Sequence, residues 1–564
     1  MSWTPYDAES YADFDDLSTF CRTLADAHPE WVELEEVGRS REDRPLWLLT
    51  VSAAERGPEG SERGERPAIW LDAATHAAEW TGVSALLYVV SRWVEQLEAG
   101  QPEVTDWFGR HEALVMPCIS PDGYQAMHEG APFLRSTKRP PSEGTVRRGL
   151  DPCDIDGDGT VRTMRWKDPA GSFVEDDDWA PFMRPRRIDD DPEEAYFLCD
   201  EGEFINWDGV EWTSAATEYG VDLNRNFPAH WEPFSMFGMD SGSYPLSEPE
   251  SRAVVDAFAD HPHVGCALTM HTYMGCVLTQ PYRKDTPLGD GDVELMKLFA
   301  DDLTEGTGYD VYQVYPEFMY DDDRPIPGVW ADTISSVFGV PGYTVELWDP
   351  FGHVGIDLEE PAKFFQEPDQ ELIREFLAKY AEDEANVQPW ERVEHPQLGE
   401  VEVGGLEYLR TIRNPPPELL AEECETAWTM VERARRSLPK VEVSVEVTAV
   451  GREAHRLRII LENQGFLPTS GLARGRQVAG TPEVGVSVDL DEGMSLDGPR
   501  HRSLEHMDGW GNLRTGSGRH PVYADLPKRG HRSWAEWTVA GSGTVTLEWL
   551  AGRGGRGSET VELG

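Results

Sequence analysis

Short apolar runs alternate with longer segments of helical periodicity over the first 380 residues of the chain. Four apolar runs, typical of strands buried on both faces, cover residues 67–74, 114–119, 263–270 and 340–347. Apolar residues at helical spacing predict helices over residues 81–97, 248–260, 292–303 and 371–380. This alternation predicts an α/β fold with a mixed, mostly parallel sheet flanked by helices. The ligand crevice of such a sheet lies beyond the carboxyl ends of its strands.

The pattern is interrupted once and then changes near residue 395. A segment rich in Asp, Gly, Pro and Arg at about residues 139–220 predicts an acidic insertion into an α/β domain of residues 1–395. Asn414-Pro-Pro-Pro417 breaks the chain, residues 418–438 have the periodicity of one helix, and strict alternation begins at Val441. We therefore expect a linker and helix over residues 396–439 and a C-terminal all-β sandwich over residues 440–564.

The charge of the chain is extreme. The formal net charge is −54, and the acidic residues are spread along the whole length. Nucleic acid is therefore not an expected partner, because it requires a basic surface. Only 8 of the 50 basic residues are Lys, and an acidic surface poor in Lys predicts adaptation to high salt, which screens self-repulsion. A GC-rich genome that favours arginine codons is the alternative explanation. The hydrophobic share of 39% still supplies enough apolar surface for folded domains.

Cysteine usage and the N-terminus bear on the cellular compartment. Seven cysteines without a CxxC pair indicate neither a disulfide framework nor a structural zinc cluster. The first residues lack the features of a signal peptide, and no run of about 18 apolar residues occurs. We expect a cytoplasmic protein without a membrane partner, while the oligomeric state stays open.

His76 and Glu79 form an HxxE pair at a predicted strand-to-helix junction, and His271 follows another apolar strand. Two imidazoles and one carboxylate suit Zn²⁺, because they fill three tetrahedral positions and leave the fourth for a water whose pKa falls toward neutrality. An isolated HxxE pair in a chain with 15 His and 104 acidic residues arises easily by chance. The interpretation therefore depends on the motifs that accompany the pair.

Seven short motifs occur in a fixed order over roughly residues 10–390. They are the run Asp72 to Trp80 around the HxxE pair, Ser120-Pro121-Asp122-Gly123-Tyr124, Phe133-Leu134-Arg135, Val221-Asp222-Leu223-Asn224-Arg225-Asn226-Phe227, Ser247-Glu248-Pro249-Glu250, His271-Thr272-Tyr273 and Thr344-Val345-Glu346-Leu347. Together they resemble the zinc carboxypeptidase family. The resemblance implies zinc ligands at His76, Glu79 and His271.

The same resemblance implies a role for five further residues. Glu346 matches the general base that takes a proton from the zinc-bound water and passes it to the leaving amine. Arg135 matches the arginine that stabilises the tetrahedral oxyanion. Asn224 and Arg225 match the pair that binds the substrate's terminal carboxylate, and Tyr273 matches a residue that lines the cleft.

Several positions depart from the family pattern. Ser120 stands where the family usually has Asn, and Ala78 replaces an arginine often found before the metal-binding Glu. The tyrosine that caps the substrate carboxylate falls near Arg324, and the nearest tyrosine is Tyr320. The residue that usually decides side-chain preference falls near Ala331, which favours a neutral or apolar terminal side chain.

A second metal site is predicted within the insertion. Asp154, Asp156, Asp158 and Thr160 place oxygens at alternate positions around Gly159, as the first half of an EF-hand loop does. The twelfth position is Arg165, so a closing acid would have to come from Glu175 or residues 176–178. The alternative to a Ca²⁺ site is an acidic, solvated loop.

These features predict a zinc-dependent metallocarboxypeptidase that removes C-terminal residues from peptides. One alternative keeps the metal and the fold but is a deacylase or amidase acting on small amino-acid conjugates. A second alternative is a noncatalytic zinc-binding or peptide-binding protein, against which the presence of Glu346 argues.

Overall fold

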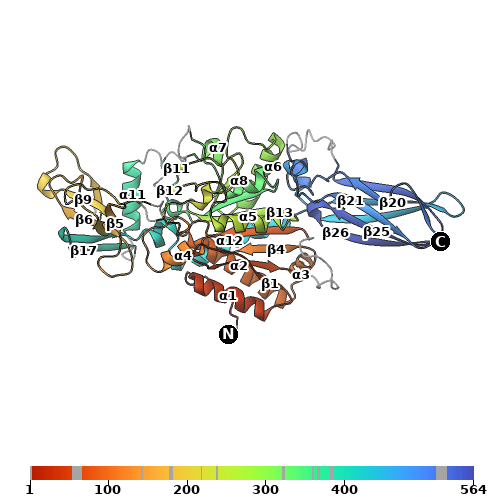
Figure 1. Cartoon of the computed structure of the whole chain (residues 1–564), viewed down its shortest axis with the longest axis horizontal. Coiled ribbons are helices and arrows are strands. Elements are labelled where there is room, and N and C mark those ends of the chain that lie inside the picture. The colour runs from red at the N-terminus through yellow and green to blue at the C-terminus, as the bar shows by residue number, and fades with distance from the viewer. Residues whose placement is uncertain are drawn as a thin grey trace.

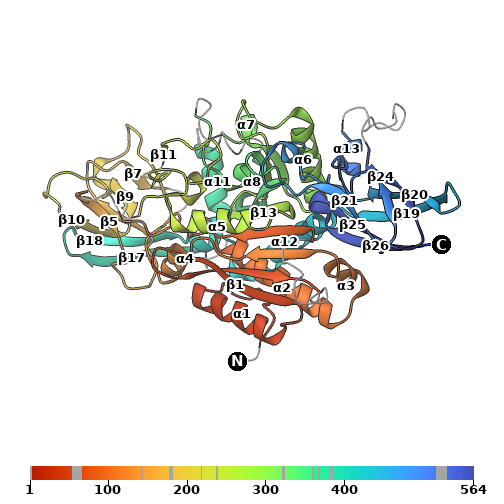
Figure 2. The ribbon, with the colours of Figure 1, turned by 45° about the vertical axis from the view of Figure 1, so that its right-hand side comes forward.

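The computed structural model of the chain describes residues 3–53, 66–140, 144–176, 182–216, 219–236, 239–319, 324–358, 361, 364, 369–381, 386–515 and 530–564. These residues form three parts that lie in a row (Figure 1). A small lobe built around residues 144–216, which we call the insertion lobe, lies at one end. The central α/β body follows, and the C-terminal sandwich lies at the other end, as a view turned by 45° also shows (Figure 2).

The central body is built on an eight-stranded mixed sheet. Its order is β1 (Val32–Arg39), β2 (Pro45–Val51), β4 (Glu112–Met116), β3 (Ala68–Ala73), β13 (Val264–Thr272), β16 (Gly342–Leu347), β14 (Cys276–Thr279) and β15 (Asp310–Gln313). The four strands from β4 to β16 run parallel to one another, whereas β2 and β14 pair antiparallel to their inner neighbours. The predicted α/β class and the four predicted strands are confirmed.

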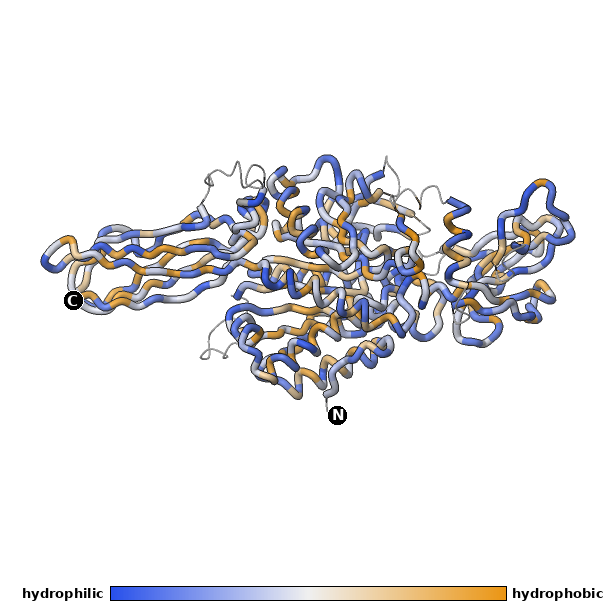
Figure 3. Tube along the Cα trace, turned by 180° about the vertical axis from the view of Figure 1, so that it is seen from behind, coloured by the Kyte–Doolittle hydropathy of each residue, from blue (hydrophilic) through white to orange (hydrophobic). Residues whose placement is uncertain are grey.

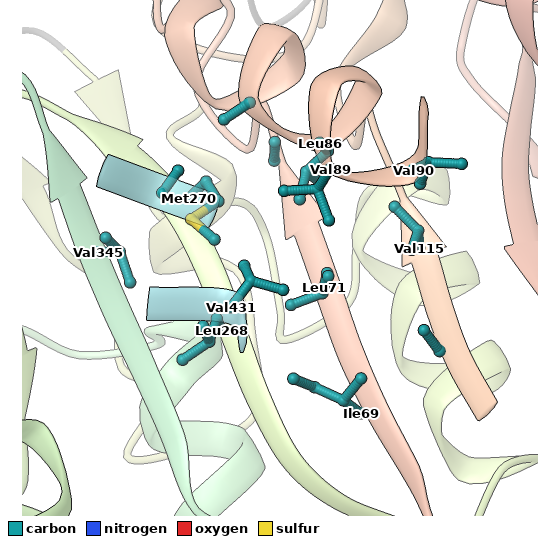
Figure 4. Close-up of a cluster of buried hydrophobic side chains, with 14 of the residues drawn as sticks. Ile69, Leu71, Leu86, Val89, Val90, Val115, Leu268, Met270, Val345 and Val431 are labelled. Carbon is teal, nitrogen blue, oxygen red and sulfur yellow. The ribbon is translucent and has the colours of Figure 1, made fainter. Parts of the chain in front are cut away.

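Both faces of this sheet are covered by helices, because successive side chains of a strand point to opposite faces. In β3, Ile69 and Leu71 pack on one face and Trp70 packs on the other. Figure 4 shows the first face, where Leu86 and Val89 of α2 meet the strands. The helices on this face are α1 (Phe14–Ala27), α2 (Trp80–Glu98), α3 (Pro102–Phe108), α6 (Asp290–Thr304) and α12 (Pro417–Arg436). The opposite face carries α5 (Pro249–Ala259) and α8 (Trp330–Ser336).

Shorter helices lie near the edges of the body. They are α4 (Pro121–His128), α7 (Val314–Glu317), α9 (Pro350–His353) and α11 (Gln370–Tyr380). Helices α2, α5, α6, α11 and α12 coincide with the five helices that the periodicity predicts.

The insertion lobe incorporates a segment from much later in the chain. Its antiparallel sheet has the order β17 (Val387–His395), β18 (Gly399–Leu406), β6 (Thr163–Lys167), β9 (Tyr196–Asp200), β7 (Phe173–Glu175) and β8 (Met183–Pro185). A separate pair joins β5 (Gly149–Pro152) to β10 (Gly202–Ile205). Arg165 of β6 is buried and pairs with Glu402 of β18, which fastens the two segments together.

The segment 396–439 therefore differs from a linker. The expected boundary at residue 395 falls in the turn between β17 and β18, which pair along their length. Helix α12 then packs on α2 and the sheet, with Leu420, Cys424 and Val431 buried in the main core. Residues 387–439 thus belong to the insertion lobe and the central body.

Two antiparallel four-stranded sheets form the C-terminal sandwich. One has the order β19 (Val441–Ala449), β20 (Ala454–Asn463), β24 (Arg532–Ala540) and β22 (Ser495–Asp497), and the other β23 (His501–Leu504), β21 (Val484–Leu490), β25 (Gly543–Ala551) and β26 (Arg556–Leu563). Apolar and polar positions alternate along these strands (Figure 3), and the apolar ones meet between the sheets. Buried Arg553 docks the sandwich by donating to the backbone carbonyls of Pro262, Val264 and Phe338.

All seven cysteines are free thiols, and five of them are buried. Within the described ranges, no helix combines the length and the hydropathy that crossing a bilayer requires.

Candidate metal centre and substrate cleft

The three predicted zinc ligands meet at the carboxyl ends of two neighbouring parallel strands. His76 and Glu79 lie between the end of β3 and the start of α2, and His271 is the penultimate residue of β13. The Nδ1 atoms of His76 and His271 are 3.1 Å apart, and they lie 2.8 and 2.9 Å from the two carboxylate oxygens of Glu79. All three side chains are almost fully buried.

The outward nitrogens of both imidazoles have partners of their own. His76 Nε2–H donates to Asp222 Oδ1 at 3.2 Å, and His271 Nε2 faces the Thr269 hydroxyl at 3.3 Å. Burial alone would raise the pKa of Asp222, but the nearby Arg225, Arg135 and His76 hold it well below its usual range. An ionised carboxylate can only accept, so the proton of His76 stays on Nε2 and its Nδ1 lone pair faces Glu79. Asp222 was missed as a site residue, although it lies inside a quoted motif.

This donor set fits zinc. Two imidazole nitrogens and a carboxylate, all electron-pair donors, lie within 4.8 Å of one another. Without a cation, the two facing Nδ1 lone pairs and the carboxylate would lack a common partner. His76, Glu79 and His271 could hold the metal in the manner of a catalytic site, because no further His, Cys, Asp or Glu of the described residues joins their cluster.

Glu346 lies directly beside the metal ligands. It pairs with His271 in the parallel register of β13 and β16. Burial raises its pKa to about 7; the charge of Glu79 acts in the same direction, and those of His271, Arg135 and Arg413 act against it. A carboxyl group with a pKa near neutrality can accept and release a proton at physiological pH.

Arg135 bridges two acids of the site. Its Nη1 donates to Glu79 Oε1 at 3.2 Å and its Nε donates to Asp222 Oδ2 at 3.4 Å. The side chain is 18% exposed and lines the cavity in front of the ligands. Arg135 thus presents a fixed positive charge next to the metal centre.

Arg225 lies farther along the same cavity, in the short helical turn Leu223–Arg225. Its Nη1 donates to the backbone carbonyl of Asn224 at 2.7 Å, and its guanidinium lies over the Phe234 ring at 6.0 Å. Asn224 is buried, and its side-chain carbonyl accepts from Trp330 N–H at 2.9 Å. Asn224 is thus turned toward α8 and, unlike Arg225, is not part of the cavity lining.

The described positions that depart from the family pattern lie outside the lining of this cavity. Exposed Arg324 also lies over the Phe234 ring, at 4.8 Å, while Tyr320 lies outside the described residues. Ala331 is fully buried in α8. Ser120 donates through its hydroxyl to the carbonyl of Ala74 at 2.6 Å and so supports the loop that carries His76.

The cleft is a cavity of about 770 Å³. Glu79, Arg135, Arg225, Tyr273 and Glu346 line its inner part. Residues 159–163 of the insertion and residues 406–410, which follow β18, line its outer part. None of the described residues from 440 onward contributes to the lining, so the insertion lobe, and not the sandwich, borders the cleft.

Two consecutive residues of the site gave no signal in the sequence. Arg413 reaches the metal centre, where its Nη1 donates to the Thr272 carbonyl at 3.2 Å and lies 3.5 Å from Glu79 Oε1. Asn414 is fully buried, and its side-chain oxygen accepts from the N–H groups of Trp80 and Thr81 at the start of α2. Both residues precede a proline run, and from the sequence alone this run predicts only the end of a regular element.

In the loop predicted to bind calcium, the Asp side chains accept hydrogen bonds from the loop's own backbone. The carboxylates of Asp154, Asp156 and Asp158 lie within 4.8 Å of one another, but each accepts from backbone N–H groups of the loop. Buried Glu201, which sequence reasoning missed, accepts three more such bonds, from Ile155, Asp156 and Arg162. Thr160 lines the cleft instead of closing a metal site.

The acids considered as closing ligands for calcium are engaged elsewhere. Glu175 pairs with Arg165, and Asp176 accepts from Arg374, while residues 177 and 178 lie outside the described residues. Calcium binding therefore stays a prediction, and neither Glu175 nor Asp176 is available to it as a closing ligand.

A candidate cation site beside a carboxyl group with a pKa near neutrality, on an α/β sheet, fits the chemistry of a zinc-dependent hydrolase. A sequence model of the zinc carboxypeptidase family matches residues 17–166 and 201–387, and because this is more than half of the chain, the chain belongs to that family. A model of a domain of unknown function matches residues 440–562. Residues 388–439, which include Arg413 and Asn414, fall between the two matches.

Individual relatives are distant. Carboxypeptidase B of Astacus astacus is 30% identical over 152 residues, which are 27% of this chain and 45% of that protein. Carboxypeptidase B2 of Rattus norvegicus is 27% identical over 277 residues, which are 48% of this chain and 47% of that protein. The chain thus spans less than half of the length of these curated relatives.

Similarity to solved structures is also low. Thrombin activatable fibrinolysis inhibitor has 17% sequence identity and a TM-score of 0.46, over 76% of this chain and 74% of that one. Carboxypeptidase A from Helicoverpa armigera has 16% identity and a TM-score of 0.41, over 68% of this chain and 76% of that one. Similarity at this level gives no information on substrates.

Proposed function

We propose that the protein is a zinc-dependent metallocarboxypeptidase that hydrolyses the C-terminal peptide bond of its substrates. The observation that carries the proposal is the position of Arg225 in the same cavity as Glu79 and Glu346. A guanidinium binds a carboxylate through two parallel hydrogen bonds, so a free C-terminus at Arg225 would leave the preceding peptide bond near the metal centre.

Each residue of the inner cleft then has a chemical task. Zinc, when bound by His76, Glu79 and His271, would act as a Lewis acid and lower the pKa of water. Glu346 would take the proton of the attacking water and transfer it to the leaving amine, a role that a pKa near neutrality supports. Arg135 would stabilise the negative charge that develops on the scissile carbonyl oxygen.

A deacylase or amidase acting on small amino-acid conjugates is the second candidate. The observation in its favour is the outer wall of the cavity, which residues 159–163 and 406–410 provide. A long peptide would have to pass this wall. The insertion lobe therefore favours short substrates in either case, and the two candidates differ in whether a terminal carboxylate is required.

Amidation of the substrate separates the two candidates. We expect kcat/KM to be higher for a blocked dipeptide with a free C-terminus than for its amide. The difference should correspond to about 2–5 kcal/mol of transition-state stabilisation. Arg225→Ala should cost a similar amount on the free substrate and little on the amide, because each change removes the same interaction. Arg225→Lys keeps the charge without the two-pronged geometry and should recover part of the loss.

The opposite result is equally informative. If the free and amidated dipeptides are hydrolysed equally well by the zinc-loaded protein, the carboxypeptidase assignment is wrong and the amidase assignment replaces it. Extending the acyl side of the substrate one residue at a time measures the effect of the insertion lobe, and rates that stay constant with length would argue against a substrate-limiting wall.

A further inference from the structure

Arg413 is a cleft residue that the family resemblance does not account for. It lies in residues 388–439, between the two matched regions, at the end of an irregular helical turn over Leu409–Arg413. The sequence lacks the arginine that the family often carries next to the metal-binding glutamate, since Ala78 stands there. Arg413 brings a guanidinium to the same glutamate from more than 300 residues later in the chain.

Most contacts of Arg413 are with neutral groups. Its Nη1 donates to the Thr272 carbonyl and its Nη2 donates to the Tyr408 hydroxyl at 2.9 Å. The guanidinium lies over the rings of Tyr273, Tyr408 and Phe133, at 5.0, 5.7 and 5.8 Å. Its Nε is buried and has no hydrogen-bond partner among the described residues. Rings and carbonyls orient a guanidinium but do not neutralise its charge.

The carboxylate nearest to Arg413 is already shared. Glu79 Oε1 lies 3.5 Å from Arg413 and 3.2 Å from Arg135, and Glu79 is also a metal ligand. Arg135 reaches Asp222 at 3.4 Å, and Asp222 in turn is stabilised by the charge of Arg225. The cleft thus contains a row of charges in the order Arg413, Glu79, Arg135, Asp222, Arg225, with three cations and two anions.

The order of these charges can be compared with the orientation of a bound substrate. If Arg225 binds the terminal carboxylate and Arg135 faces the scissile carbonyl, Arg413 lies at the opposite end, beside the acyl part of the substrate. The charges of the lining residues cancel when Glu346 is ionised, so a net positive charge of the cleft requires bound zinc. Bound zinc adds two positive charges and Glu346 adds at most one negative charge, while Arg162 and Arg410 offset Asp200 and Glu407 in the outer cavity. The terminal carboxylate at Arg225 neutralises one of the two charges that zinc adds, and an anionic acyl group would neutralise the other.

We propose that Arg413 binds a carboxylate on the acyl side of the scissile bond, so that the enzyme prefers substrates with an acidic residue immediately before the residue it releases. This inference rests on the proposed function, because the acyl side is defined by the terminal carboxylate at Arg225. Phe133, Tyr273 and Tyr408 hold the guanidinium in place, and the Arg413 side chain, which is 14% exposed, lines the cavity.

The test uses two N-acetyl dipeptides that differ only in Glu or Gln at the penultimate position. For the zinc-loaded full-length protein, we expect kcat/KM to be about tenfold or more higher for the Glu substrate. Arg413→Gln should abolish this ratio, and Arg413→Lys should retain part of it. Arg410→Gln is the matched control, since Arg410 also lines the cavity but lies over Trp80, away from Glu79, and it should retain the wild-type ratio.

A purely structural role for Arg413 predicts a different pattern. Arg413→Gln would then lower the rates of the Glu and Gln substrates equally, and the proposal would be wrong. Equal kcat/KM values of the wild type for both substrates would also overturn it. Binding is measured separately by calorimetry with the α-amides of N-acetylglutamate and N-acetylglutamine, which lack a terminal carboxylate for Arg225. A preference for the α-amide of N-acetylglutamate that Arg413→Gln removes, without hydrolysis of either dipeptide, would support the role of Arg413 while refuting the carboxypeptidase assignment.

Discussion

Asn414→Ala tests whether a residue outside the family motifs holds the metal centre together. Helix α2 begins with Glu79 at its N-cap position, but that side chain faces the metal site and makes no capping hydrogen bond. Asn414 substitutes for it: its Oδ1 accepts from Trp80 N–H at 2.7 Å and from Thr81 N–H at 3.1 Å. Its Nδ2 donates to the Ala78 carbonyl at 2.8 Å and to the Leu409 carbonyl at 2.9 Å.

The magnitude follows from the groups that lose their partner. Asn414 is fully buried, so Asn414→Ala leaves two backbone N–H groups at the start of α2 without an acceptor. Each buried, unsatisfied donor costs about 1–3 kcal/mol, whereas a solvent-exposed cap is worth about 0.5–2 kcal/mol. We therefore expect a local destabilisation of about 2–5 kcal/mol, toward the lower value if a water molecule enters the space left by the amide.

Hydrogen exchange and zinc affinity measure this effect directly. The amides of the first turn of α2 should exchange at least about thirtyfold faster in Asn414→Ala, which corresponds to the lower limit of about 2 kcal/mol. Because Glu79 is attached to this turn, the dissociation constant for zinc, measured by chelator competition, should rise about tenfold.

Asn463→Ala is the matched control. Asn463 is also buried, accepts from two backbone N–H groups, those of Lys440 and Gly465, and donates to two carbonyls, but it lies at the base of the sandwich. It should destabilise the protein by a similar amount and leave zinc affinity unchanged. Unchanged exchange of the α2 amides in Asn414→Ala, or equal loss of zinc affinity in both variants, would refute the reasoning.

Four further outcomes are expected. His76→Ala, Glu79→Ala and His271→Ala should each lose bound zinc by metal analysis, and full occupancy would exclude that residue as a ligand. Glu346→Gln should keep zinc but lose about 10²–10⁴ in rate, and wild-type kcat/KM should fall as the pH is lowered from about 7 toward 4.5, because the protonated carboxyl cannot accept a proton. Burial raises the pKa of Glu250 to about 7, so protonated Glu250 stabilises the folded protein fully below pH 4.5, and this stabilisation is lost as the pH rises through 7. The free energy of unfolding of the wild type should therefore fall by about 3 kcal/mol between these pH values, whereas that of Glu250→Gln should not fall for this reason. Parallel curves of unfolding free energy against pH for the two proteins would contradict this. With a net charge of −54, the melting temperature should rise from about 0.1 M to about 2 M KCl, and a flat or falling curve would refute adaptation to salt.

The sequence predicts the central body well because the information is local. A strand buried on both faces is a continuous apolar run, and the run predicted at residues 67–74 is β3 at Ala68–Ala73. The sheet of the insertion lobe could not be predicted in the same way. Its Arg165–Glu402 pair joins residues 237 positions apart, and antiparallel pairing at that distance leaves no periodic trace in the chain.

The same distinction applies to the site. Motifs indicated seven side chains that the structure brings together. Glu79, Arg135, Arg225, Tyr273 and Glu346 line one cavity, and His76 and His271 contact Glu79. The motif around Asn224 does not reveal that its side chain bonds to Trp330 instead of lining the cavity. Motif matching also could not find Arg413 and Asn414, because they lie beyond the matched region and act through contacts with residues near the start of the chain.

The position of Asn414 is explained by two different demands on Glu79, which is both the N-cap residue of α2 and part of the candidate metal site. A helix start favours Ser, Thr, Asp or Asn at the N-cap, but the candidate zinc site has the carboxylate of Glu79 at this position. The Glu79 carboxylate faces His76 and His271, so the first N–H groups of α2 need an acceptor from elsewhere. Asn414 provides it, and the adjacent Arg413 reaches the same glutamate from the cleft side. The segment before the proline run is therefore coupled to the metal centre both structurally and electrostatically, and substitutions there should change zinc binding and substrate preference together.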